Sequence, residues 1–264
     1  MFSSTAFVIL IVIIITQIIK FFRKTPQSYE VEQIFFLMAS ILLLMDFAYR
    51  SFTIRFPAVT NTYEALVFFT ALICLFLYYI VRKIPGPPGK DCAAGHTGVY
   101  RLVLFAGSVT AFLFLALASS PLLPATLQPS VPVLQSYWLT VHVLLTFAGE
   151  AFFVTASASA IVFLVTSSED RKREADRISS IAVLTGYFLF TAGGLVFGMI
   201  WAEKARGNYW SWDPKETWAL VTWLSYTLYL YLRIFMGKRG NLTAVVAIAG
   251  LLCGTFTFFL ASAI

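Results

Sequence analysis

The sequence predicts an all-α, polytopic integral membrane protein, a bundle of about eight transmembrane helices. Hydrophobic residues make up 59% of the 264 residues and charged residues only 12%, and the mean hydropathy is +0.82. A soluble domain cannot hide so much apolar surface, whereas a bilayer can. Backbone groups inside a bilayer must satisfy their own hydrogen bonds, so the apolar runs are expected to be helices.

The apolar runs follow one another along the whole chain, and each is long enough to cross a bilayer. They cover residues 5–22, 31–49, 64–81, 102–119, 138–166, 181–201, 217–235 and 242–264. No separate soluble segment and no internal repeat interrupts them. We therefore expect residues 1–264 to form a single transmembrane domain.

The distribution of Lys and Arg predicts the orientation. Fourteen of the 19 basic residues fall in one alternate set of connections. The other set holds the remaining five, which are Arg50, Arg55, Lys204, Arg206 and Lys215. The positive-inside rule makes the richer side cytoplasmic and puts both termini on the other side. The first span has its charges after it, which predicts an anchor with its N-terminus outside. The net charge of +6 is thus a topology signal and does not require a nucleic acid.

The second span ends close to two acidic residues. Asp46 lies one helical turn before Arg50, a spacing at which the two side chains can pair, and Glu64 stands at the mouth of the third span. Acidic residues inside spans either mark a functional site or form a structural ion pair. Both interpretations stay open here.

The connections predicted to be cytoplasmic contain no metal-binding or thiol-redox motif. Residues 83–98 are rich in Pro and Gly and predict an irregular loop. Cys92 and His96 lie in that loop, but two ligands do not make a metal site, and the three cysteines contain no Cys-x-x-Cys pair. Residues 171–177 read as a solvated linker before the sixth span.

The start of the fifth span places an aromatic residue and a histidine together. Trp138 and His142 are one turn apart on one face, at the outer end of the span. The histidine is either a metal ligand or a helix-end residue bonded to a carbonyl. Glu150 lies deeper on roughly the same face and must be sheltered, with no evident partner. Glycines 193, 194 and 198 allow a close helix contact or leave room for a ligand.

The segment from Gly207 to Trp218 is the longest polar and aromatic interruption of the chain. An indole face is wide and prefers to stack on another flat ring, so several indoles in one segment predict a binding surface for a flat ligand. An interfacial aromatic belt is the alternative, but a belt does not require such clustering. Asp213, Pro214 and Glu216 have the N-cap, first-turn and capping-box spacing. The loop is therefore expected to be fixed to the helix that follows.

The residues from Trp201 to Trp223 also carry a resemblance. The run Trp-Ala-Glu-Lys-Ala-Arg-Gly-Asn-Tyr-Trp-Ser-Trp-Asp-Pro-Lys-Glu-Thr-Trp resembles the tryptophan-rich WWD signature of haem-handling proteins. Within them it is most similar to the CcsA/ResC branch of cytochrome c biogenesis proteins. Pro57 to Glu64, Ser136 to Val143 and Tyr229 to Arg233 are similar to further elements of that family.

The resemblance implies a haem-handling protein of a bacterial or organellar energy-transducing membrane. Such a protein holds haem b on the outer face for attachment to the Cys-x-x-Cys-His motif of apocytochrome c. Its partner would be a CcsB/ResB-like membrane protein, in a complex that acts as a cytochrome c synthase (haem lyase). Whether this chain is itself an enzyme stays open, and no catalytic residue is assigned.

The resemblance also implies which residues hold the haem. His142 is the expected axial ligand of the iron. The residues expected to contact the haem are His142, Trp138, Trp201, Tyr209, Trp210, Trp212, Asp213, Trp218, Arg206 and Lys215. Tyr231, Arg55 and Glu64 are secondary candidates, of which Tyr231 and Arg55 stand at positions where the family has membrane histidines.

The chain departs from the family pattern in its histidines. Of four expected histidines it keeps His142 alone. The haem then uses other donors, travels by another route, or takes a ligand from a partner. A second hypothesis is a non-catalytic membrane subunit of a redox complex that uses the same surface for a quinone or a partner. Stoichiometric haem in the purified protein would favour the first hypothesis.

Overall fold

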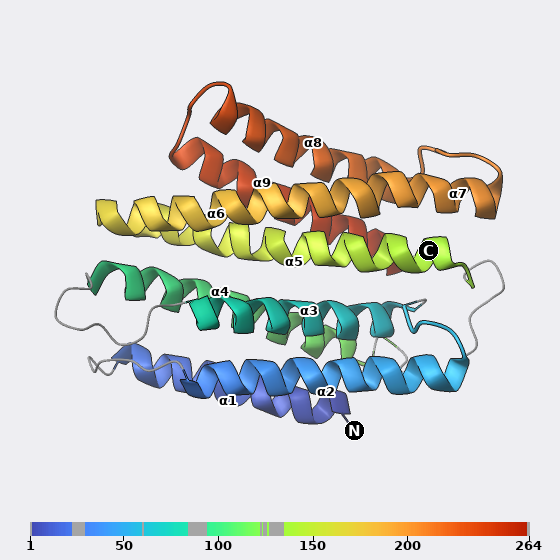
Figure 1. Ribbon diagram of the computed structural model, residues 1–264, viewed down its shortest axis with the longest axis horizontal. Coiled ribbons are helices and arrows are strands. Elements are labelled where there is room, and N and C mark those ends of the chain that lie inside the picture. The colour runs from blue at the N-terminus through green and yellow to red at the C-terminus, as the bar shows by residue number, and fades with distance from the viewer. Residues whose placement is uncertain are drawn as a thin grey trace. The chain divides into compact units, whose positions relative to one another are not determined.

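A computed structural model of the chain describes residues 2–22, 30–59, 61–83, 94–121, 123, 126 and 135–262. Figure 1 shows helices throughout, and these residues contain no strand. The helices are α1 (Phe2–Phe22), α2 (Glu30–Ile54), α3 (Thr62–Lys83), α4 (Ala94–Ala118), α5 (Tyr137–Val165), α6 (Glu169–Phe190), the π-helix η2 (Thr191–Phe197), α7 (Gly198–Arg206), α8 (Pro214–Ile234) and α9 (Asn241–Ser262).

The predicted fold class is confirmed, because every predicted apolar run falls on a helix. Six helical stretches of the described residues are long and apolar enough to cross a membrane. They are Phe2–Phe22, Glu30–Ile54, Thr62–Arg82, Val99–Ala118, Tyr137–Val165 and Glu169–Arg206. Asn241–Thr257 is a shorter apolar helix, and α8, which is rich in Trp, Tyr and Thr, is less apolar. The chain is a multi-pass, all-α membrane protein.

The predicted linker over residues 171–177 is wrong, because α6 already begins at Glu169. Its first turn carries Glu169 and Asp170, and acidic residues there complement the helix dipole. The segment is also held against α8, because Arg233 of α8 donates to both carboxylate oxygens of Asp176 at 2.5 and 2.7 Å. Of the predicted loop 83–98, the part from Ala94 is helical, and Cys92 lies outside the described residues.

The helices group into two compact units, Met1–Ser130 and Val131–Ile264, which are described separately. The single domain expected from the sequence stays a prediction. In the first unit, α1 and α3 each pack against α2 and α4. The predicted pair is confirmed, since Arg50 Nε lies 3.1 Å from Asp46 Oδ2. The same guanidinium lies 3.9 Å from Glu64 Oε1 and 4.3 Å from the centre of the Tyr63 ring, so it joins α2 to α3.

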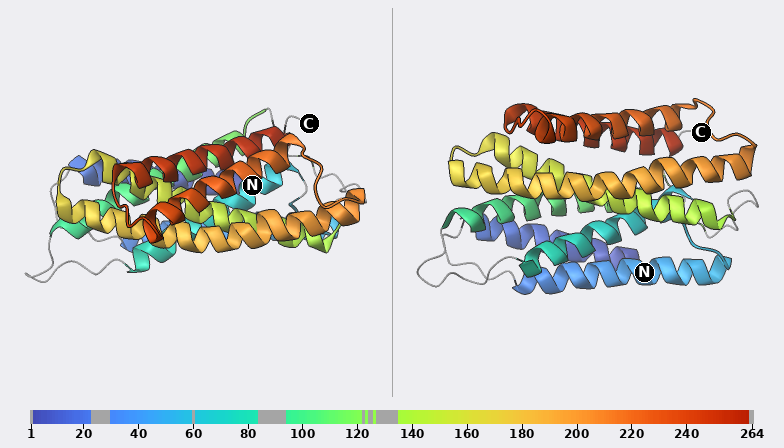
Figure 2. Two further views of the ribbon diagram at one scale, coloured as in Figure 1. Left: turned by 90° about the horizontal axis from the view of Figure 1, so that it is seen from above. Right: turned by 45° about the horizontal axis from the view of Figure 1, so that its top comes forward.

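The second unit contains α5, α8, α9 and one long rod, which consists of α6, η2 and α7 (residues 169–206). Figures 1 and 2 show α6 continuing through η2 into α7 without a break in direction. α5 packs against α6, η2 and α9, and α8 packs against α9 and α6. The first turn of α5 and the α7–α8 connection lie at the same end of this unit (Figure 1).

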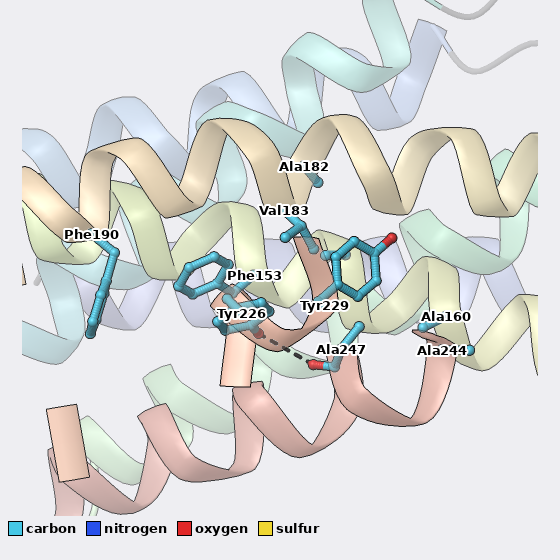
Figure 3. Close-up of a cluster of buried hydrophobic side chains, with 10 residues drawn as sticks. Phe153, Ala160, Ala182, Val183, Phe190, Tyr226, Tyr229, Ala244 and Ala247 are labelled. Atoms are coloured by element: carbon cyan, nitrogen blue, oxygen red, sulfur yellow. Dashed lines mark hydrogen bonds between the residues drawn. The ribbon is translucent and has the colours of Figure 1, made fainter. Parts of the chain in front are cut away.

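An aromatic cluster fills the middle of the second unit (Figure 3). The rings of Phe153 on α5 and Tyr226 on α8 stack with centroids 3.6 Å apart and an interplanar angle of 13°. Tyr226 is fully buried, and its hydroxyl donates to the Ala247 carbonyl of α9 at 3.3 Å. The stack and this hydrogen bond hold three helices in register, since a buried hydroxyl needs its acceptor.

The α5 and α6 backbones touch where two glycines face each other. A Cβ atom at Gly186 would lie 2.8 Å from the Gly149 carbonyl oxygen, and a Cβ at Gly149 would lie 2.8 Å from the Phe190 amide nitrogen. Real Cβ atoms essentially never approach backbone so closely. Small residues allow such contacts between membrane helices, and this contact fixes the height of α5 against α6.

We predict that Gly186→Val destabilises the protein by about 3 kcal/mol, since overpacked cores typically cost about 1–3 kcal/mol and two backbones cannot yield as a side chain does. The measurement is the apparent melting temperature of the purified protein in detergent. Leu184→Val is the matched control, because it introduces the same side chain on an exposed face of α6. Equal melting temperatures for both variants would contradict the close contact.

Candidate functional site

His142 is held by the backbone of the π-helix. Its Nδ1 lies 2.8 Å from the Gly193 carbonyl oxygen. A carbonyl oxygen can only accept, so Nδ1 carries the proton and the neutral ring keeps an unprotonated Nε2. No described residue donates to that Nε2. A fixed tautomer with a free ring nitrogen is the usual state of a metal-binding histidine.

Glycines in the rod make this contact sterically feasible. A Cβ at Gly193 would lie 2.5 Å from the Thr146 amide nitrogen, and a Cβ at Gly198 would lie 3.1 Å from His142 Nδ1. The expected close helix contact is therefore confirmed at Gly193, and Gly198 leaves room for the imidazole. The π-turn shifts the helical bonding, so that the Gly198 amide donates to Gly193 O. Such turns are frequent at functional sites.

Trp138 lies one turn before His142, as the spacing predicts. Its ring stacks on Phe197, the last residue of η2, with centroids 6.0 Å apart and an angle of 24°. The side chain is 42% exposed. A fixed and open indole face thus stands beside the histidine.

Arg206 ties the two ends of the Trp-rich loop together. It is the last residue of α7, and its guanidinium donates to Asp213 Oδ2 at 2.8 Å, to Ser211 Oγ at 3.1 Å and to Glu216 Oε1. Glu216 Oε2 in turn accepts from the Ser211 amide at 2.7 Å. These four residues form a closed polar ring that we call the loop clamp.

The predicted helix start at Asp213 is confirmed. Its side chain accepts from the Glu216 amide at 2.8 Å, and Pro214 is the first residue of α8. Burial acts to raise the pKa of Asp213, but the hydrogen bonds from the Glu216 amide and the Arg206 guanidinium outweigh it, so this pKa lies below the ordinary 3.8. The ionised form therefore stabilises the loop above pH 3.8, and this contribution is lost as the pH falls further.

The loop clamp holds its aromatic residues in a strained arrangement. Trp212 has a φ of 57°, a left-handed conformation that is a real outlier for a bulky residue and persists only when its surroundings enforce it. The rings of Trp210 and Trp212 meet edge to face, 5.7 Å apart and at 84°. The two indole rings of the loop are therefore nearly perpendicular. Tyr209 and Trp212 are 61% and 70% exposed.

The remaining candidates lie in different places. Trp218 packs edge to face against Phe256 of α9 at 4.6 Å. Lys215 is exposed at the start of α8, and Glu150 is buried on α5.

The secondary candidates belong to both units. Tyr231 is exposed on α8 and stacks on Phe235 at 5.7 Å. Arg55 and Glu64 belong to the first unit: Arg55 is exposed with a φ of 57° just after α2, and Glu64 is buried in the first turn of α3. Their suggested roles stay predictions.

The donor set near His142 restricts the metal chemistry. Within the part of the chain that the structure describes, no group of three His, Cys, Asp or Glu side chains could hold a metal ion. A single imidazole holds iron firmly only where the other ligands arrive with the metal, as the four nitrogens of a porphyrin do. The exposed indole of Trp138, one turn before His142, suits such a flat, apolar ligand.

The fold and this site define a multi-pass membrane protein in which one imidazole and a clamped, Trp-rich loop lie toward the same end of the second unit. The sequence profile of the family described as "Cytochrome C assembly protein" matches residues 1–263, and the chain belongs to this family. It is similar to the cytochrome c biogenesis protein CcsA of Welwitschia mirabilis, with 31% identity over 79% of this chain and 76% of the relative. The CcsA proteins of a Prochlorococcus marinus strain and of Chlamydomonas reinhardtii are 30% and 33% identical, over 81% and 77% of this chain and 75% and 57% of their own length. Its role therefore lies in cytochrome c biogenesis.

We predict that Arg206→Gln loosens the loop clamp, because Asp213 and Glu216 lose the cation between them. The clamp is partly exposed, so the loss is about 1 kcal/mol and chymotrypsin should cut after Tyr209 and Trp212 about fivefold faster. Lys204→Gln is the control, since Lys204 is exposed and pairs only with its neighbour Glu203 at 3.5 Å. Equal cleavage rates in the two variants would refute the clamp.

Proposed function

We propose that the second unit holds haem for cytochrome c maturation, with His142 as the axial ligand of the iron. The observation that carries this proposal is the hydrogen bond from His142 Nδ1 to the Gly193 carbonyl. It fixes the imidazole and leaves the lone pair of Nε2 for a metal. Membership of the cytochrome c assembly family supports iron in a haem over a bare ion.

Aromatic side chains at the end of the unit where α5 begins provide the contacts that a porphyrin needs. Trp138 offers a face one turn away from the ligand, and Tyr209, Trp210 and Trp212 stand on the clamped loop. Apolar rings fixed in advance bind a flat ligand without the entropic cost of ordering them. The cargo is haem b, whose vinyl groups are still free to react.

Arg206 and Lys215, the two cations expected to bind the ligand, differ in the hydrogen bonds that they make within the protein. Both terminal nitrogens of Arg206 are bonded within the loop clamp, so Arg206 acts first as a structural residue. Lys215 is exposed at the start of α8 and is not one of the four residues of the loop clamp. Lys215 is therefore the cation that neutralises the haem propionates.

The single imidazole implies partners. Of the two histidines of the chain, only His142 lies in the second unit, so the sixth position of the iron must be filled from elsewhere. The Cys-x-x-Cys-His motif of apocytochrome c brings both a histidine and the thiols that receive the haem. A CcsB/ResB-like membrane protein is the partner that completes the complex.

The proposed location is an energy-transducing membrane, with the Trp-rich loop on the extracytoplasmic side. A continuous, largely apolar helix joins Glu169 to Arg206, and basic residues are concentrated in its first turns. Reporter domains fused after Arg173 and after Arg206 should therefore report opposite sides of the membrane, the first cytoplasmic. Fusions that report the same side would disprove this topology.

Haem binding itself is tested at His142. The purified protein should show a five-coordinate haem spectrum, or one with a weak sixth ligand, because the unit has only one imidazole. His142→Ala should lose most of the haem, and added imidazole should restore part of it by occupying the vacated position. Absorption spectra of both proteins, with and without imidazole, give the measurement.

His96→Ala is the control, since His96 belongs to the first unit and should not affect haem content. A stable bis-histidine spectrum from this chain alone would disprove the ligand assignment. Co-purification with an oxidoreductase in the absence of haem would instead favour the redox-subunit hypothesis.

A further inference from the structure

Two indole N–H groups of the second unit find no acceptor among the described residues. The Nε1 atoms of Trp201 and Trp210 are both buried, and neither donates to any described residue. The contrast is Trp223, whose Nε1 donates to Thr191 Oγ1 at 2.9 Å. A buried donor without an acceptor costs free energy, and folded proteins leave few of them. Two such donors next to one loop call for an explanation.

Arg206 lies near both tryptophans. Its guanidinium carbon lies 5.8 Å from the centre of the Trp201 ring, and Trp201 precedes it by five residues on α7. The same guanidinium donates to the side chain of Ser211, the residue directly after Trp210. The loop clamp therefore links the segments that carry the two indoles.

The polar groups of the clamp are already used by one another. The oxygens of Asp213 and Glu216 accept from Arg206, Ser211 and the Glu216 amide, so they are not offered to the indoles. Together with Lys215, the charges of Arg206, Asp213 and Glu216 cancel. An incoming anion would thus meet two N–H donors and no net negative charge.

A carboxylate is the acceptor that fits these donors. Indole N–H groups only donate, and a hydrogen bond to an ionised oxygen is roughly twice as strong as one between neutral groups. We infer that Trp201 and Trp210 form a carboxylate-recognition site, in which their indole N–H groups donate to the carboxylates at the edge of the ligand. The inference rests on the proposed function, in which that ligand is a haem and the carboxylates are its propionates.

The site gives the two tryptophans a role beyond stacking. Stacking uses the face of an indole and would be served by phenylalanine, whereas these nitrogens are at the ring edge. Neighbouring side chains cover both nitrogens, so a ligand must displace some of them.

The test separates the N–H group from the ring. Trp201→Phe and Trp210→Phe keep an aromatic face, although a smaller one, and remove the donor. Each variant and the wild type are titrated with haem and with haem dimethyl ester, whose carboxylates are blocked and uncharged. We expect each substitution to weaken haem binding about tenfold relative to the ester, since one charge-assisted hydrogen bond is lost.

Trp223→Phe is the matched control, because its N–H group already has an acceptor within the protein. It should change the affinities for haem and ester by the same factor. If Trp201→Phe does not fold, Trp210→Phe carries the test alone, because Trp210 lies in the loop outside the helical packing.

The outcomes distinguish this inference from the proposed function. Equal losses for haem and ester in the Trp201 and Trp210 variants, or no loss at all, would overturn the carboxylate site while leaving haem binding in place. A wild-type protein that binds neither ligand would overturn the proposed function, and this inference with it. A loss confined to haem supports both.

Discussion

The hydrogen bond from His142 to the Gly193 carbonyl is the contact on which the site depends. It exists because Gly193 has no side chain: a Cβ there would lie 2.5 Å from the Thr146 amide nitrogen, and α5 would have to move away. The π-turn makes Gly193 O the acceptor for the Gly198 amide as well, which holds the carbonyl in place. A backbone irregularity thus sets the tautomer of a side chain on another helix, and the tautomer decides which nitrogen faces a metal.

Packing elsewhere in the unit keeps His142 and the loop at the same end. The Phe153–Tyr226 stack and the Gly149–Gly186 contact set the heights of α5, α6 and α8 relative to one another. The loop clamp then fixes the seven residues between α7 and α8, against the strain at Trp212. The clamp thus lies outside the aromatic cluster, yet it determines where the rings of the loop point.

The sequence predicted the helices, the Asp46–Arg50 pair and the Asp213 cap because each follows from local spacing. Hydrophobic runs, an i,i+4 pair and an N-cap with Pro at the next position are all readable within one or two turns. The contact of His142 with Gly193 joins residues 51 positions apart, and no local pattern encodes it. Arg206 was expected to serve the ligand, and only the folded loop shows that its guanidinium is taken by Asp213 and Glu216. The helical start of α6 was missed because residues 171–177 are mostly charged and look like a linker, and the contact of Asp176 with Arg233 exists only in the folded protein.

The proposed site has a property that a permanent haem protein would avoid. Two strong axial ligands from one chain would retain the haem, while one imidazole leaves a coordination position for an incoming ligand. The orphan N–H groups of Trp201 and Trp210 act in the same direction, since a donor that is unsatisfied without cargo raises the free energy of the empty state and favours capture. In the proposed scheme, capture relies on the aromatic rings and the ligand's carboxylates, and hand-over relies on the open face of the iron. A carrier must bind its cargo and later release it. Binding at the edge of the porphyrin, with one coordination position of the iron left open, allows both.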